Sequence, residues 1–138
     1  MQFLYLLPTI IFYTLSLTAI YVSLSRGDEI DKKIAFSLLF AAVATTLSQG
    51  EHPLRLNSIK FLVIDCILFS YVLLNALKSK KYWPLVSCAS ILSGVVSHLI
   101  PILYIPIPEL AYFAANNIWG YICVTALIIG VFIEKSTD

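Results

Sequence analysis

Apolar stretches long enough to cross a membrane constrain this chain more than any other feature of its sequence. Crossing the roughly 30 Å hydrocarbon core of a bilayer takes about 20 apolar residues in a helix. Short polar breaks separate stretches near this length, at residues 3–24, 34–49, 61–77, 83–103 and 109–132. Charged residues make up 12% of the chain, against about 25% in a soluble domain. The sequence therefore predicts an all-α fold: a polytopic transmembrane helical bundle of five spans, forming one domain over residues 1–138 with no soluble domain.

The second stretch is the shortest, and it leaves an alternative open. Gly50-Glu51-His52-Pro53 ends it with both a flexible and a helix-breaking residue. Because so short a stretch can fail to cross the bilayer, four spans plus a re-entrant segment is the alternative to five spans. The first stretch has no basic region before it and no small-residue cleavage signal after it. We therefore expect it to be retained as a spanning helix.

Lysine and arginine residues are unevenly divided between the two sides that five spans would create. One side would hold Arg26, Lys32, Lys33, Lys78, Lys80, Lys81 and Lys135. The other side would hold Arg55 and Lys60. Under the positive-inside rule, this asymmetry predicts an N-terminus outside and a C-terminus in the cytoplasm.

Charge and cysteine usage exclude several classes of function. The net charge is +1 and the basic residues are interleaved with acidic ones, so no basic stripe for nucleic acid is present. The three cysteines stand far apart in apolar runs, which argues against a zinc site or a disulfide framework. The acidic and histidine residues are scattered singly without metal-ligand spacing, and no serine lies in a nucleophile elbow. We expect no metal, no cofactor and no catalytic residue.

Polar residues within the apolar stretches are the candidate site. An ionisable side chain at the centre of a spanning helix costs about 2.5–3.5 kcal/mol on insertion scales, so it needs a partner or a hydrated cavity. Asp65 is the clearest case, about one turn inside the third stretch. Alternating helix directions would place it beside His98 and Asn116, in the outer half of the membrane. The residues predicted to be intramembrane polar or pore-lining are Asp65, His98, Asn116, Asn117, Gln49, Ser90 and Ser97, and the outer-face candidates are Glu51, His52 and Glu109. They either line a hydrated path or binding cavity, or they make structural hydrogen bonds between helices.

Small residues form seams at helical spacing on three of the stretches. Membrane helices pack through such seams because small side chains let the backbones approach closely. The residues predicted to pack helices are Ser37, Ala41, Gly94, Gly120 and Gly130.

Short motifs in the second half of the chain carry a resemblance. A basic loop leads into Tyr82-Trp83-Pro84, His98-Leu99 follows late in the same stretch, and the last stretch contains Ala111-Tyr112 and Trp119-Gly120-Tyr121. In these features residues 78–121 resemble small uncharacterised polytopic inner-membrane proteins of alphaproteobacteria. The resemblance implies a location in the bacterial inner membrane and carries no activity.

Three functions fit a chain whose loops are too short to hold a separate domain. The leading hypothesis is a homo-oligomeric assembly whose polar seams form a pore or ion-conducting path, acting as a membrane effector. The second is a non-catalytic accessory subunit of a larger inner-membrane complex. The third is a membrane enzyme or carrier that uses Asp65 and His98. In each case the lipid bilayer is the expected surrounding.

Overall fold

Five helices make up nearly all of the protein. The computed structural model describes residues 2–50 and 53–135, and these residues contain no strand. The helices are α1 (Gln2–Arg26), α2 (Glu29–Ser48), α3 (Leu54–Lys78), α4 (Trp83–Ile102) and α5 (Glu109–Lys135). The predicted all-α fold is confirmed.

Four of these helices, α1, α3, α4 and α5, are long and apolar enough to cross a membrane. The protein is therefore a multi-pass membrane protein. The remaining helix, α2, has 20 residues and begins with a cluster of charges at Glu29, Asp31, Lys32 and Lys33. Its uncharged part, residues 34–48, is roughly 22 Å long at 1.5 Å per residue.

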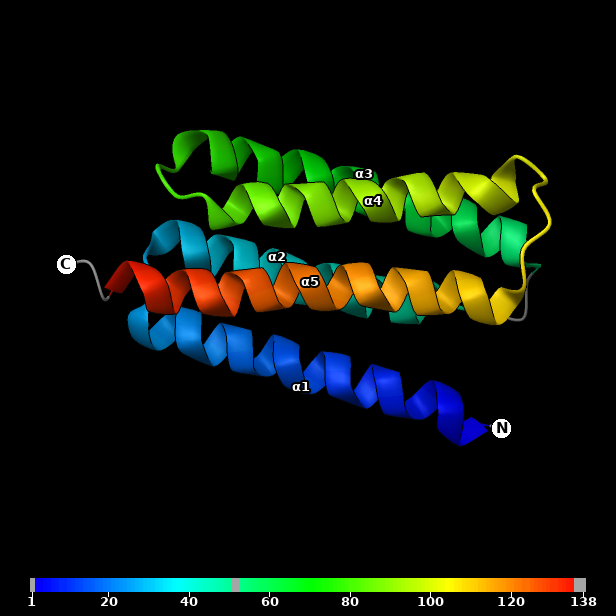
Figure 1. Cartoon of the computed structure of the whole chain (residues 1–138), viewed down its shortest axis with the longest axis horizontal. Helices are drawn as coiled ribbons and strands as arrows, with labels where there is room; N and C mark the ends of the chain where they lie inside the picture. The colour runs from blue at the N-terminus through cyan, green and yellow to red at the C-terminus, as the bar shows by residue number, and fades with distance from the viewer. Residues whose placement is uncertain (1, 51–52, 136–138) are drawn as a thin grey trace.

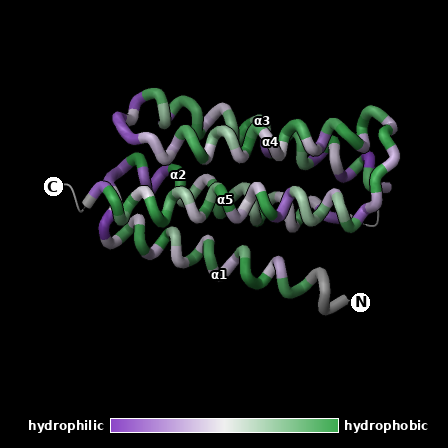
Figure 2. The backbone as a smooth tube through the Cα atoms, in the orientation of Figure 1, coloured by the Kyte–Doolittle hydropathy of each residue, from purple (hydrophilic) through white to green (hydrophobic). Residues whose placement is uncertain are grey.

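The helices lie side by side and run alternately in opposite directions (Figure 1). The turns after α1 and after α3 lie at the same end of the bundle as the C-terminus, and the N-terminus and the α4–α5 connection lie at the other. Helix α5 packs against α1, α4 and α2, while α3 packs against α2 and α4. In Figure 2 hydrophobic residues occupy most of the helix lengths, and a hydrophilic group gathers at the end near the C-terminus.

Two helices begin earlier than their apolar stretches predict. Asp28 accepts a hydrogen bond from the Asp31 backbone N–H at 2.9 Å, and the Asp31 carboxylate accepts one from the Asp28 N–H at 3.0 Å. This capping box starts α2 at Glu29. Helix α3 starts directly after Pro53, and its first turns are too polar to register as apolar. Asp65 therefore lies eleven residues, roughly 16 Å, inside α3 rather than the single turn that the sequence predicted.

The surface of the bundle is apolar, and its hydroxyl groups are satisfied locally. Large side chains such as Phe40 and Leu47 are more than three-quarters exposed, as lipid-facing residues are. The exposed hydroxyls of Thr14, Thr18 and Ser70 each donate to the carbonyl four residues earlier at 2.8 Å. An outer face of this kind can contact lipid without leaving a side-chain hydroxyl unpaired.

The end of α4 is fixed by an unusual turn. Tyr104 has a φ of 60°, and hydrogen bonds from Ile105 N–H to Ile100 O and from Tyr104 N–H to Pro101 O, both 3.2 Å, close a Schellman motif. The Arg55 guanidinium lies over the Tyr104 ring, 4.1 Å from its centroid, and donates to its hydroxyl. This contact ties the start of α3 to the end of α4.

Candidate functional site

A chain of hydrogen bonds joins three helices inside the bundle. Asp65 Oδ2 lies 3.0 Å from His98 Nε2, and His98 Nδ1 lies 2.5 Å from the Tyr112 hydroxyl. That hydroxyl lies 3.1 Å from Ser58 Oγ. His98, Tyr112 and Ser58 are buried, whereas the Asp65 side chain is 23% exposed. Asp65 is therefore the end of the chain that an incoming ligand or proton can reach.

Helical spacing and one glycine bring these groups together. Ser58 and Asp65 are seven residues apart on α3, and Gly94 and His98 are four apart on α4, so each pair shares a face. A Cβ atom at Gly94 would lie 3.1 Å from Asp65 Oδ2, tighter than most such contacts. The absence of a side chain at Gly94 therefore leaves room for the carboxylate. The Phe61 ring packs beside the imidazole, with centroids 5.8 Å apart.

The hydrogens in this chain can run in either direction. With Asp65 ionised, Tyr112 donates to His98 Nδ1 and His98 Nε2–H donates to the carboxylate. With Asp65 protonated, Asp65 donates to Nε2, Nδ1–H donates to Tyr112, Tyr112 donates to Ser58, and Ser58 donates to the Leu54 carbonyl at 2.8 Å. In both patterns the imidazole is neutral and each of these donors has an acceptor. Asp65 can therefore gain or lose a proton without creating a charged histidine.

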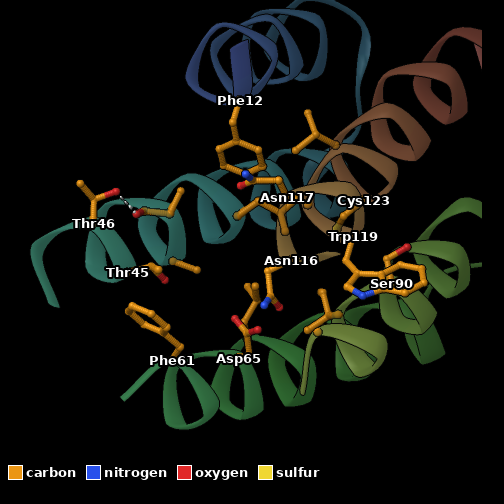
Figure 3. Close-up of a pocket in the computed structure, with 18 of the residues that line it drawn as sticks. Phe12, Thr45, Thr46, Phe61, Asp65, Ser90, Asn116, Asn117, Trp119 and Cys123 are labelled. Carbon is orange, nitrogen blue, oxygen red and sulfur yellow. Dashed lines mark hydrogen bonds between the residues drawn. The ribbon is translucent and has the colours of Figure 1, made fainter. Parts of the chain in front are cut away.

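A cavity of about 220 Å³ opens beside Asp65 and is lined by residues from all five helices. Aromatic side chains form much of its wall: Phe12, Tyr13, Phe61, Tyr112, Phe113 and Trp119. Figure 3 shows Asp65 and Asn116 pointing toward one another across the cavity, with Phe12 entering from the side of α1. The ionisable groups on the wall are Tyr13, Asp65, His98, Tyr112 and Cys123. A carboxylate thus faces a small space with six aromatic side chains on its wall.

The structure brings together most of the polar residues singled out in the sequence. Six of the seven intramembrane candidates line the cavity, namely Asp65, His98, Asn116, Asn117, Gln49 and Ser90. The seventh, Ser97, accepts a hydrogen bond from the Trp119 indole at 3.2 Å. Glu109 lies at the exposed start of α5, away from this group. Glu51 and His52 lie outside the described residues.

The predicted packing residues have different surroundings. Ala41, Gly94 and Gly120 lie on the cavity wall, and a Cβ at Gly120 would come within 2.9 Å of the Phe12 ring. Gly130 lies directly against the Trp83 ring. Ser37 bonds to the Ile34 carbonyl and lies on the outside, between α2 and α3. Three of the five therefore belong to the cavity as well as to helix packing.

Two members of the hydrogen-bond chain, Tyr112 and Ser58, were not among the site residues predicted from sequence. Ser58 precedes residue 61, where the third apolar stretch begins. The signal that could have found it is its seven-residue spacing from Asp65, which is two helical turns. Tyr112 precedes Asn116 by one turn on the same face of α5.

A charged cluster that the sequence did not reveal lies at the C-terminal end of α3. The Lys81 ammonium group contacts Asp31 at 2.8 Å, Asp28 at 2.9 Å and Glu134 at 2.6 Å. Burial disfavours the charge on Lys81, but the hydrogen bonds to Asp31, Glu134 and Asp28 outweigh it and raise the pKa of Lys81. Burial likewise disfavours the Asp28 carboxylate, yet hydrogen bonds from the Asp31 backbone and from Lys81 lower the pKa of Asp28. These contacts stabilise the charged forms of Lys81 and Asp28.

Among the described residues, no group of three or more His, Cys, Asp or Glu side chains is placed to hold a metal ion. The side chains on the cavity wall supply one carboxylate, one imidazole, one thiol, amides, hydroxyl groups and aromatic rings. Comparisons of the chain with protein-family models, with curated proteins and with solved structures find no match.

Proposed function

We propose that this protein is a membrane carrier that binds a small organic cation at Asp65 and exchanges it for a proton. The observation that supports the proposal is the partly exposed Asp65 carboxylate on the wall of an aromatic cavity inside the bundle. A carboxylate supplies a charge-assisted hydrogen bond to an ammonium group. Aromatic faces attract the same positive charge, by about 0.5–2 kcal/mol for each good contact.

The size of the cavity favours a small ligand. Pockets for drug-sized molecules are usually about 300–1,000 Å³, and this cavity is about 220 Å³. Asn116 and Asn117 on its wall add amide groups that can orient a polar substituent. A primary or quaternary ammonium with one short apolar group fits this lining.

The hydrogen-bond chain accommodates the proton that the exchange requires. A proton that enters through the cavity adds to Asp65, the exposed end of the chain, and the reversed hydrogen-bond pattern then keeps the imidazole neutral. The protonated carboxyl has lost the charge that holds the cation, so proton and cation compete for one group. Intramembrane carboxylates and histidines serve proton relays of this kind in pumps and transporters.

Binding of benzylammonium to the purified protein tests the proposal, with neutral benzyl alcohol as the matched control ligand. Trp119 on the cavity wall reports binding through its fluorescence. Asp65→Asn should weaken benzylammonium binding roughly tenfold to a hundredfold, the value of a hydrogen bond to a charged group, and leave benzyl alcohol unchanged. Lowering the pH should weaken the binding of benzylammonium to the wild type and not to Asp65→Asn.

The control variant is Asp28→Asn, which removes a carboxylate far from the cavity. It should bind benzylammonium as the wild type does. A proton gradient across liposomes should then drive benzylammonium uptake through the wild type. Equal binding of the charged and neutral ligands would contradict the binding site, and binding without uptake would contradict the carrier.

The position in the membrane is part of the same proposal. We take α2 as a fifth span, because it packs between α1 and α3 in the alternating bundle. The uneven distribution of lysine and arginine then puts the C-terminus in the cytoplasm. The resemblance of residues 78–121 supports the bacterial inner membrane. A homo-oligomeric pore and an accessory subunit stay predictions, since both depend on contacts with other chains.

A further inference from the structure

A second hollow, of about 610 Å³, lies on the outside of the bundle between α2 and α3. Phe36 and Phe40 from α2 and Ile67 from α3 form its middle. Lys32, Lys33 and Glu29 lie at one end of it. We call this hollow the α2–α3 groove.

The charged end of the groove carries a positive charge. Two lysines and one glutamate give a net charge of +1, and the ion pair between Lys33 and Glu29, at 2.6 Å, uses one of the lysines. Tyr71 from α3 lines the same end and can add a phenolic hydroxyl. The groove is therefore suited to a single negative charge beside a long apolar surface.

The length of the groove matches one acyl chain. From Lys33 to Ala44 the α2 side extends eleven residues, roughly 16 Å. This is about half of the 30 Å hydrocarbon core, the depth of one leaflet. Phe36 and Phe40 are both at least half exposed, so an acyl chain can pack against their rings.

We propose that the α2–α3 groove binds one singly charged anionic phospholipid, with its phosphodiester at Lys32 and Lys33 and an acyl chain along Phe36, Phe40 and Ile67. Basic pockets between membrane helices bind lipid headgroups in this way. The site is separate from the cavity at Asp65 and does not depend on the proposed carrier function.

Native mass spectrometry in a mixture of phosphatidylglycerol and phosphatidylcholine with identical chains tests the site. The wild type should retain one phosphatidylglycerol. The double variant Lys32→Gln, Lys33→Gln should lower its preference for phosphatidylglycerol by about tenfold or more, since each lysine near a headgroup contributes appreciably. The matched control, Lys78→Gln with Lys80→Gln, removes the same charge at the same end of the bundle outside the groove. It should keep the preference.

A second variant tests the apolar half of the groove. Ile67→Trp fills the groove, so it should reduce retention of phosphatidylglycerol while the lysines remain. Equal retention of the two lipids by the wild type, or equal loss of preference in both lysine double variants, would overturn the proposal. A wild-type dimer that Ile67→Trp dissociates would overturn it too, because a second copy would then occupy the groove. Thermal melting of each variant shows that the fold is kept.

Discussion

Asp65 lies in the middle of α3 and Lys81 in the turn that follows the same helix, and each is surrounded by polar side chains from other helices. Lys81 contacts three carboxylates, and its hydrogen bonds to them raise the pKa of Lys81. Asp65 contacts the His98 imidazole, and the other imidazole nitrogen contacts the Tyr112 hydroxyl, which contacts Ser58. Each hydroxyl group can act as donor or acceptor in these bonds. The first cluster fixes the relative positions of α2, α4 and α5. The hydrogen bonds of the second can point in either direction along the chain.

We therefore expect the Lys81 cluster to contribute more to stability and the Asp65 cluster more to function. Removing one partner of a buried ion pair strongly destabilises the fold, because the remaining charge stays buried without a partner. A carboxyl in a reversible chain can be replaced by a neutral amide of the same shape with less effect on folding.

Replacing Lys81 by Met should cause the largest loss. It leaves Asp31, which is 1% exposed, next to Asp28 and Glu134 without their common cation. Removing one partner of a buried ion pair costs about 3–5 kcal/mol, and since Lys81 and Asp28 are partly exposed we expect about 3 kcal/mol. The measurement is the free energy of unfolding in mixed micelles.

Two further variants serve as controls for Lys81→Met. Lys80→Met removes an exposed lysine one residue away and should change stability by less than about 0.5 kcal/mol. Asp65→Asn removes the carboxylate of the other cluster and should cost less than Lys81→Met. If Asp65→Asn were the more destabilising of the two, Asp65 would be a structural residue and the contrast between the clusters would fail.

The contrast also explains which parts of the structure could be predicted from sequence. Apolar length alone identifies α1, α3, α4 and α5, because hydropathy measures the property that inserts them. Matching depths along alternating helices was enough to expect Asp65 near His98. The start of α2 was missed because a capping box of Asp28 and Asp31 is charged and does not register as apolar.

The Lys81 cluster could not be predicted for a different reason. Lys81, Asp31 and Glu134 lie about 50 residues apart along the chain, and they meet only when three helix ends take particular rotations. No local pattern determines those rotations. In the sequence the basic run around Lys81 indicates only a loop on the cytoplasmic side. Helix rotation is likewise what brings Ser58 and Tyr112 to His98.

Two glycines, one near each cluster, give the second prediction. Alanine at Gly130 would overlap the Trp83 ring, which is buried, whereas alanine at Gly94 would meet only the end of the Asp65 side chain at 3.1 Å. Overpacking costs about 1–3 kcal/mol. Both substitutions gain the same helix propensity, about 1 kcal/mol. The difference between their stabilities therefore reports the contacts that each added methyl group makes.

We therefore expect Gly130→Ala to lower the melting temperature more than Gly94→Ala. Gly94→Ala should instead weaken benzylammonium binding, since it displaces the carboxylate. The melting temperature and the binding affinity are measured on the same preparations. Equal melting temperatures for the two variants would show that Trp83 moves aside without cost.

The smallest effect is expected at Tyr104, which closes α4 at the end of the bundle away from Lys81. A non-glycine residue at φ 60° costs about 1–2 kcal/mol, and Tyr104→Gly removes this cost. The same change loses the contact with Arg55, worth about 0.5–1 kcal/mol at an exposed site. The two effects nearly cancel, so unfolding free energies should show a net stabilisation below about 1 kcal/mol. In an Arg55→Ala background the contact is already absent, and Tyr104→Gly should stabilise by the full relief of strain. A destabilisation by Tyr104→Gly of the same size in both backgrounds would mean that the Tyr104 ring stabilises this end through contacts other than Arg55. The Asp65 half of the bundle would then be held as firmly as the Lys81 half.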